Sequence, residues 1–255
     1  MSEFERQLRE YMSAFQAALV TDIGDWVVKG FIDACQNVYN ISSDTKVISK
    51  LIALMLFPLL NQFARKYDYG LVLAKHQNHY PDITFVSSTG EKIAFDLKST
   101  YRVSASRARG FTLGAFTGYF RQRDSNKNTT YPYREYSHHY VLGIIYSHSD
   151  IAVDERRVYK LAELTNIQSV AHDFVFLLCE KWKLAADRPG SGNTKNIDSE
   201  NSIQALVHGE GAFAAQGEAV FDDYWMNYLT SDMARAIDSS VPYNNLNEYW
   251  EWRNR

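Results

Sequence analysis

The stretch of residues 77–100, "QNHYPDITFVSSTGEKIAFDLKST", decides the fold prediction because it reads as one β-hairpin. Apolar residues alternate with other residues in "DITFVS" and in "KIAFDLK", and a period of two is typical of strands. Ser88, Thr89 and Gly90 form a three-residue loop between the two runs, with glycine available for a left-handed conformation. That loop makes Ser87 face Glu91, and it brings Phe85 opposite Ile93 and Ile83 opposite Phe95.

The same register gathers three charged residues. Asp82 is expected opposite Asp96, and Lys98 follows on the same strand face as Asp96. Facing carboxylates lie roughly 4.5–5.5 Å apart at Cβ and repel each other, so a divalent cation between them is favourable. Oxygen ligands select a hard ion such as Mg²⁺, and Lys98 is placed to offset charge on a phosphate oxygen or to help deprotonate water. The alternative is a surface salt bridge between Lys98 and the two aspartates.

Composition excludes several classes of protein. The chain has 255 residues, 45% of them hydrophobic, which is enough for one large globular domain with a full core. Its two cysteines, Cys35 and Cys179, lie in no C-x-x-C or paired-histidine pattern, so neither a disulfide framework nor a zinc site is expected. The N-terminus has no apolar signal-like run, and Pro58 interrupts "LIALMLFPLL". We therefore expect a cytoplasmic protein that spans no membrane.

Charge is distributed unevenly although the net charge is only −3. Residues 98–134 contain eight Lys and Arg residues against one acidic residue, and residues 199–223 contain five acidic residues and no Lys or Arg. A basic stretch of this kind favours contact with a polyanion such as DNA. The alternative is a solvated charged face.

The remaining pattern predicts an α/β (mixed α+β) fold in which a central mixed β-sheet is flanked by helices. Helices are expected over residues 3–20, from Ser43 or Asp44 through Tyr67 with a kink near Pro58, and within residues 221–229 and 244–255. The other expected strands cover residues 71–75, 140–147 and 173–185. Three segments rich in Ser, Asn, Gly or Arg, residues 100–110, 121–130 and 186–196, are expected to be loops.

The chain also resembles a known family. "PD" followed by "DLK" matches the PD…D/E-x-K nuclease superfamily, and the longer motifs "SDTKV", "QNHYPD", "IAFDLKSTY", "FTLGAFT", "GSGNTKNI", "DYWMNY" and "YNNLNEYWEW" occur in the order found in type II restriction endonucleases of the EcoRV family. The resemblance covers roughly residues 43–252. It implies one restriction-endonuclease domain over residues 1–255, with an N-terminal helical and dimerisation part (about 1–70), a catalytic core (about 71–180) and a recognition loop with C-terminal helices (about 181–255).

This resemblance assigns roles to residues. Asp82 and Asp96 correspond to the metal ligands and Lys98 to the catalytic lysine. Gln77 and Asn78 correspond to a loop that approaches the minor groove. The major-groove recognition loop corresponds to Gly190, Ser191, Gly192, Asn193 and Thr194, in which Asn193 can pair with an adenine edge. The positions that resemble phosphate contacts are Thr100, Tyr101, Thr112, Gly118 and Lys127.

Three departures from the family pattern stand out. The family has a glutamate where this chain has Ala53, and a glutamine where it has His76. The segment of residues 121–128 is longer than in the family, which affects the assignment of Lys127. His138 and His139 are expected to be structural rather than a metal pair, because adjacent residues of a strand face opposite sides.

The implied function is Mg²⁺-dependent double-strand cleavage of palindromic DNA by a homodimer, with Mn²⁺ able to replace Mg²⁺. The family implies a site like GATATC, a blunt cut, 5′-phosphate ends, and a bacterial host with a partner DNA methyltransferase. Two alternatives stay open. One is a repair, recombination or transposition nuclease with the same hairpin. The other is a sequence-specific DNA-binding protein without activity, since Ala53 stands where the family has a glutamate.

Overall fold

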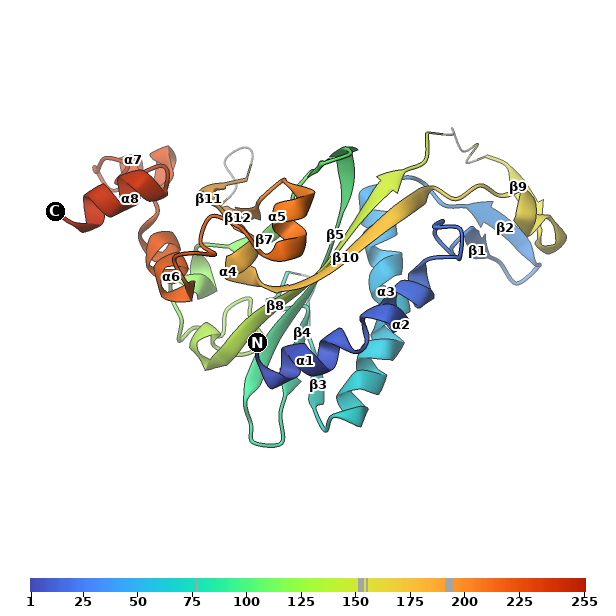
Figure 1. Ribbon diagram of the computed structural model, residues 1–255, viewed down its shortest axis with the longest axis horizontal. Coiled ribbons are helices and arrows are strands. Elements are labelled where there is room, and N and C mark those ends of the chain that lie inside the picture. Colours follow the sequence, from blue (N-terminus) through green and yellow to red (C-terminus); the bar gives the residue numbers. More distant parts are fainter. Residues whose placement is uncertain (77, 151–153, 155, 191–194) are drawn as a thin grey trace. The chain divides into compact units, whose positions relative to one another are not determined.

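The computed structural model describes residues 1–76, 78–150, 154, 156–190 and 195–255 (Figure 1). Its helices are α1 (Glu3–Arg9), α2 (Met12–Leu19), α3 (Thr45–Lys66), α4 (Lys181–Leu184), α5 (Ile203–His208), α6 (Glu218–Asn227), α7 (Ser231–Ala236) and α8 (Leu246–Arg253), with 3₁₀ turns η1 (Gly118–Phe120), η2 (Tyr133–Glu135) and η3 (Leu161–Asn166). Its strands are β1 (Gly30–Ile32), β2 (Asn37–Asn40), β3 (Gly70–Leu73), β4 (Ile83–Val86), β5 (Lys92–Ser104), β6 (Arg107–Ala108), β7 (Thr112–Ala115), β8 (Tyr136–His148), β9 (Val158–Lys160), β10 (Ala171–Glu180), β11 (Ala185–Pro189) and β12 (Asn196–Ser199).

These strands form three sheets. The largest has the order β10-β8-β5-β4-β3, with β6 paired to β5, and two smaller sheets have the orders β1-β2-β9 and β11-β12-β7. The predicted fold class, a mixed α+β protein with a central mixed sheet and flanking helices, is confirmed. The chain divides into two compact units, one made of residues 1–68, 98–109 and 143–176 and the other of residues 69–97, 110–142 and 177–255.

The β4–β5 hairpin has the predicted register. Phe85 pairs with Ile93 and Ile83 pairs with Phe95. The Ser87 amide donates to the Glu91 carbonyl at 2.9 Å, and Gly90 has a φ of +85°, which is the left-handed conformation that the three-residue loop needs. Because one residue of slip would move every side chain to the other face, the confirmed pairing fixes which residues share a face with Asp82 and Asp96.

Helix α3 begins where the sequence predicts. The Asp44 side chain accepts hydrogen bonds from the amides of Lys46 and Val47, at 2.8 and 3.2 Å, and so caps the first turn. By length and composition α3 alone among the described helices could cross a membrane, a test that core helices of soluble proteins also pass. A buried stripe runs along it: Ile48, Ile52, Leu56, Leu60, Phe63 and Ala64.

The single helix predicted over residues 3–20 is two helices, α1 and α2. Between them Glu10 and Tyr11 keep helical backbone angles, but their amides bond to the carbonyls three residues back, Gln7 and Leu8. The turn is therefore tightened rather than unwound.

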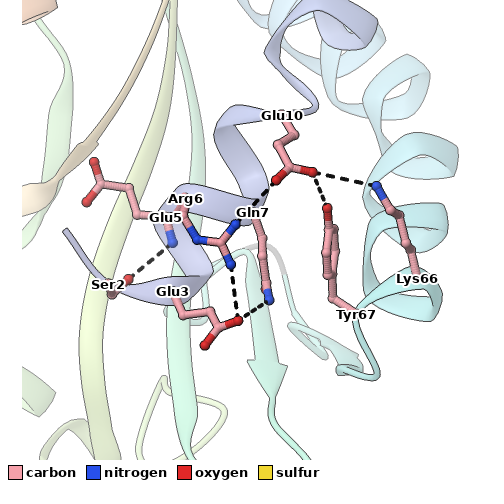
Figure 2. A network of polar contacts seen from close by, with 8 residues as sticks. All are labelled: Ser2, Glu3, Glu5, Arg6, Gln7, Glu10, Lys66 and Tyr67. Atoms are coloured by element: carbon pink, nitrogen blue, oxygen red, sulfur yellow. Dashed lines mark hydrogen bonds and ion pairs between the residues drawn. The ribbon is translucent and has the colours of Figure 1, made fainter.

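A polar network joins α1 to the end of α3 (Figure 2). The Glu10 carboxylate accepts a hydrogen bond from the Tyr67 hydroxyl and lies 3.6 Å from Lys66 Nζ and 3.5 Å from Arg6 Nη1. These partners, the Tyr67 hydroxyl above all, lower the pKa of Glu10. Glu3 accepts from Arg6 and Gln7 in the same network, so α1 is tied to α3 through side chains at the surface.

Two sequence predictions of irregular structure were wrong in part. Residues 100–110 are not a loop, because β5 continues to Ser104 and turns back as β6, with Arg102 paired to Ala108. Residues 186–196 contain the end of β11 and the start of β12. Conversely, the strand expected over residues 173–185 stops at Glu180 and continues as the short helix α4. Composition rich in Ser, Arg and Asn did not reveal these short strands, because strand formation depends on the pairing partner more than on intrinsic propensity.

The sheet β1-β2-β9 was not predicted at all. Phe31 pairs with Tyr39, and their rings stack at 5.4 Å between centroids. The buried residues of this region form a small cluster of Val38, Tyr159 and Ile167. Its exposed apolar side chains, which we call the β1–β9 apolar patch, are Phe31, Ile32, Val158, Leu161 and Leu164.

Candidate active site

Two carboxylates meet just beyond the paired part of the β4–β5 hairpin. The Asp82 amide donates to Asp96 Oδ1 at 3.1 Å, and the Leu97 amide donates to Asp82 Oδ2 at 3.0 Å. Each aspartate thus accepts a hydrogen bond from the backbone of the other strand, which holds both side chains in fixed positions. Asp96 is only 4% exposed. The structure therefore brings together the two residues that the sequence predicted as a pair.

Lys98 lies two residues beyond Asp96 on β5. Strand alternation places it on the same face as Asp96. It is half-buried. The boundary between the two compact units falls between Leu97 and Lys98, and the catalytic role of Lys98 stays a prediction.

The carboxylate pair fits a hard divalent cation by its chemistry. Mg²⁺ in proteins is typically held by one or two carboxylates, with water and substrate phosphate completing its shell. The half-buried Asp82 and the buried Asp96 each accept a hydrogen bond from the backbone of the other strand, and both offer only oxygen atoms as metal ligands, which matches that requirement. Within the described ranges no group of three or more His, Cys, Asp or Glu side chains is placed to hold a metal. The assignment of Asp82 and Asp96 as metal ligands stays a prediction.

Tyr80, two residues before Asp82 in the sequence, belongs to a buried aromatic cluster. The Tyr80 hydroxyl and His139 Nδ1 lie 2.7 Å apart, and the Tyr80 ring stacks on those of Tyr119 and Tyr133 at 5.0 and 5.8 Å between centroids. Burial, followed by the charge of Lys181, holds the pKa of His139 well below its usual range, while burial raises the pKa of Tyr80. Tyr80 is therefore the donor and the neutral His139 the acceptor.

The neighbouring histidine has a different partner. His138 Nδ1 lies 3.3 Å from Glu180 Oε1, and Lys183 Nζ lies 2.8 Å from Glu180 Oε2. The hydrogen bond to Glu180 raises the pKa of His138, and the same bond with that from Lys183 lowers the pKa of Glu180 to about 2. His138 and His139 thus serve two separate contacts, in agreement with the structural role expected for both.

The two predicted base-reading loops are described only in part. Asn78 is exposed in the turn before Tyr80, whereas Gln77 lies outside the described residues. Gly190 is half-buried, and its amide donates to the Asn196 carbonyl at 3.3 Å, which closes the base of the hairpin between β11 and β12. Ser191, Gly192, Asn193 and Thr194 lie outside the described residues, so their roles stay predictions.

The predicted phosphate contacts differ in exposure. Thr112 on β7, Gly118 at the start of η1 and Lys127 are exposed. Thr100 is 6% exposed, which leaves little of its surface for a phosphate. Tyr101 is half-buried, with its ring 4.8 Å from that of His148 between centroids.

The basic stretch is partly used within the protein. Arg102 donates to the Asp173 carbonyl, Arg121 to the Tyr228 carbonyl and Arg123 to the Asp222 carboxylate. Arg134 pairs with Asp124 at 2.5 Å. Arg107, Arg109 and Lys127 are exposed and remain the best candidates for contact with a polyanion. Counting charges along the sequence therefore overstated the charge available for binding.

Lys181 is a member of the aromatic cluster that the sequence did not predict. It is 1% exposed, and its Nζ lies 4.6 Å from the centroid of the Tyr80 ring. The only sequence signal was a lysine in the apolar run "LLCEKWKLA", which suggested a strand rather than a buried cation. Nothing in that run indicated Tyr80 as its partner.

Comparisons with known proteins identify the family of this chain. The family model described as "Restriction endonuclease EcoRV" matches residues 22–254. The type II restriction enzyme EcoRV of Escherichia coli is 35% identical over 238 residues, covering 92% of this chain and 94% of that enzyme. Among solved structures, the NlaIV restriction endonuclease aligns with a TM-score of 0.45 and 10% identity, covering 97% of this chain and 95% of its own. Since the family model matches most of its length, the chain belongs to the EcoRV family of type II restriction endonucleases.

Proposed function

We propose that the protein is a Mg²⁺-dependent endonuclease that cuts both strands of a palindromic DNA site like GATATC, leaving blunt ends with 5′-phosphates. The observation that carries the proposal is the pair of carboxylates, Asp82 and Asp96, each bonded to the other's strand at 3.0–3.1 Å. The family supports the class of reaction. Mn²⁺ is expected to replace Mg²⁺, because both accept carboxylate oxygens in octahedral geometry.

In this reaction a water oxygen bonds to phosphorus while the bond from phosphorus to the 3′ oxygen breaks. The water loses a proton and the 3′ oxygen gains one, so the products are a 5′-phosphate and a 3′-hydroxyl. Asp82 and Asp96 would hold the divalent cation, which supplies a Lewis acid that offsets charge on phosphate oxygens. Lys98 would stabilise the negative charge that develops on the phosphate or take part in proton transfer from the water.

The proposed assembly is a homodimer whose symmetry matches the palindrome. Support comes from the β1–β9 apolar patch, in which Phe31 is 61% exposed and Ile32 54%. Exposed apolar side chains gathered on one small sheet and the turn beside it are candidates for contact with a partner. The further proposed context is a bacterial cytoplasm, with a DNA methyltransferase that modifies the same site without forming a stable complex.

A plasmid assay tests the proposal. Purified protein is incubated with plasmid in Mg²⁺ or in EDTA, and the ends are sequenced. Linear product in Mg²⁺ alone, with one recurrent sequence at its ends, supports the proposed reaction. Specific DNA binding without nicking at any Mg²⁺ or Mn²⁺ concentration would instead favour the inactive DNA-binding protein that Ala53 suggests. Ends without a common sequence would favour a repair or recombination nuclease.

A second assay separates sequence reading from backbone contact. Asn193→Ala is expected to reduce cleavage of the preferred site far more than binding to arbitrary DNA, because a base contact discriminates by roughly 1–3 kcal/mol. Replacing Arg107 and Arg109 by Ala is expected to weaken binding to all DNA and to reduce its salt dependence. Titration of cognate and scrambled duplexes at several salt concentrations measures both. An unchanged ratio of cognate to scrambled cleavage in Asn193→Ala would remove that residue from recognition.

A further inference from the structure

A buried lysine lies within the aromatic cluster next to the proposed metal ligands. Lys181 begins α4 and is 1% exposed. Its ammonium group faces three rings, with Nζ 4.6 Å from the Tyr80 centroid, 5.3 Å from that of Tyr133 and 5.6 Å from that of Phe120. A cation over aromatic faces is attracted by their negative π-surface, most strongly where water is excluded. The three rings thus hold one charge in a dry environment.

Gly114 lies close to the Tyr119 hydroxyl and within ordinary contact distance of Lys181. Gly114 has a φ of +106°, and a Cβ at that position would lie 3.9 Å from Lys181 Nζ and 3.0 Å from the Tyr119 hydroxyl. A side chain there would therefore press on the cluster as well as strain the backbone. The glycine thus leaves room for Tyr119, whose ring stacks on that of Tyr80.

Tyr80 connects this arrangement to Asp82. Its amide donates to the Asn128 carbonyl at 3.0 Å, and its own carbonyl accepts from Thr130 N at 2.8 Å and Thr129 Oγ1 at 3.0 Å. Its ring is held by Lys181, and its hydroxyl by His139. Only Pro81 separates it from Asp82, whose amide bonds to the Asp96 carboxylate. Displacement of the Tyr80 ring would therefore shift the position of Asp82, which lies only two residues away.

We propose that Lys181 is a positioning residue for the metal ligand Asp82, and that it acts through the ring of Tyr80. The inference rests on the proposed function, since it assigns a task to Lys181 in the same reaction. The cation itself need not contact the metal or the DNA. Its task is to keep the Tyr80–Pro81–Asp82 segment in the one geometry in which both carboxylates can share an ion.

Metal binding separates this role from a purely electrostatic one. Lys181→Met keeps the length of the side chain and removes its charge. If Lys181 acted only as a nearby cation, its removal would tighten binding of a second cation such as Mn²⁺. If it positions Asp82, its removal should weaken Mn²⁺ binding, and we expect a loss of about tenfold or more, with a similar loss in single-turnover cleavage rate.

The experiment measures unbound Mn²⁺ by electron paramagnetic resonance as each protein is titrated, without DNA. Lys183→Met is the matched control, because it removes one positive charge from the same helix at a more exposed side chain. It should bind Mn²⁺ within about twofold of wild type. Circular dichroism establishes that each variant is folded. If Lys181→Met does not fold, Lys181→Gln replaces it with the same expectations.

A double-mutant cycle tests the route through Tyr80. Tyr80→Leu should lose Mn²⁺ affinity by about the same factor as Lys181→Met, and the double variant should lose no more than either one. Unchanged or tighter Mn²⁺ binding in Lys181→Met would overturn the proposal, and so would additive losses in the double variant. Asp96→Ala tests the metal site independently of Lys181. If this variant binds Mn²⁺ as wild type does, the proposed metal site is wrong, whatever the result for Lys181→Met.

Discussion

The β4–β5 hairpin and the β1-β2-β9 sheet are both small antiparallel structures, yet they bury their residues differently. In the hairpin Ile83, Phe85, Ile93 and Phe95 are at most 3% exposed, and even Asp96 is 4% exposed. In the other sheet Phe31 and Ile32 are mostly exposed over a buried cluster of three residues. The hairpin lies inside the larger sheet, between β3 and β8, which suits a site that must hold charges in place. The other sheet leaves apolar surface for a partner.

The largest effect is expected at Asp96 in the hairpin. Asp96→Ala is expected to reduce the single-turnover cleavage rate by a factor of about 10² or more, because it removes a metal ligand. It should leave the folded state intact, since Asp96 contributes charge rather than apolar packing. Rates are measured at saturating Mg²⁺, with unfolding followed by circular dichroism. Lys98→Ala is expected to lose activity to a comparable degree.

Asp232→Ala serves as the control for that loss, because Asp232 is an exposed acidic residue on α7 paired with Arg235. It should cleave as wild type does. Rates of Asp96→Ala within threefold of wild type would remove the hairpin carboxylate from the mechanism. Loss of activity together with loss of the folded state would assign Asp96 to the core instead.

A second variant tests the β1-β2-β9 sheet. Phe31→Asp places a charge in the β1–β9 apolar patch, and we expect it to raise the dissociation constant of the dimer by about 30-fold or more, the scale of a central interface residue. Sedimentation velocity at several protein concentrations measures the change. Mn²⁺ binding at the hairpin should stay at the wild-type level, because that site is built from a different part of the chain.

Val207→Asp is the matched control, since Val207 is an exposed apolar residue of α5 at 42%. It should leave the association state unchanged. A wild-type protein that sediments as a monomer at all concentrations, with or without DNA, would contradict the proposed dimer. Equal effects of both substitutions would show that the patch has no special role.

The smallest expected effect concerns the ion pair between His138 on β8 and Glu180 on β10, two neighbouring strands of the central sheet. The lowered pKa of Glu180, about 2 against 4.5, contributes stability that is present above pH 4.5 and is lost as pH falls through 2. The raised pKa of His138 contributes stability that is present below pH 6.5 and is lost as pH rises through its folded value. Both contributions are therefore complete between pH 4.5 and 6.5.

Glu180→Gln should accordingly lower the melting temperature most near pH 5.5 and less at pH 8. Because Glu180 and His138 are only partly buried, we discount the pair to about 1 kcal/mol, or roughly 2–4 °C for a chain of this size. Thermal unfolding at pH 3, 5.5 and 8 provides the measurement. His138→Gln should abolish the fall in stability above pH 6.5. The fall in stability at low pH should remain, because the Glu180–Lys183 pair is still present. A shift independent of pH would show that the pair contributes packing rather than charge.

The parts of the fold that were predicted correctly depend on local pattern. The hairpin register follows from strand alternation and a three-residue loop with Gly90, and the start of α3 follows from Asp44 before an apolar run. The break between α1 and α2 was missed, because it consists of two residues that keep helical angles. The strand expected to end at Ala185 stops at Glu180, where α4 begins with Lys181, whose side chain lies in the aromatic cluster.

By itself the sequence determined the hairpin, its register and the meeting of Asp82 with Asp96, because neighbouring residues with a period of two and a defined turn leave one pairing that buries the apolar side chains. Only the tertiary structure decided that Arg102 and Arg123 are engaged with Asp173 and Asp222, and that Lys181 lies over Tyr80. Those contacts join residues far apart along the chain, and their partners depend on how strands and helices pack rather than on any local spacing.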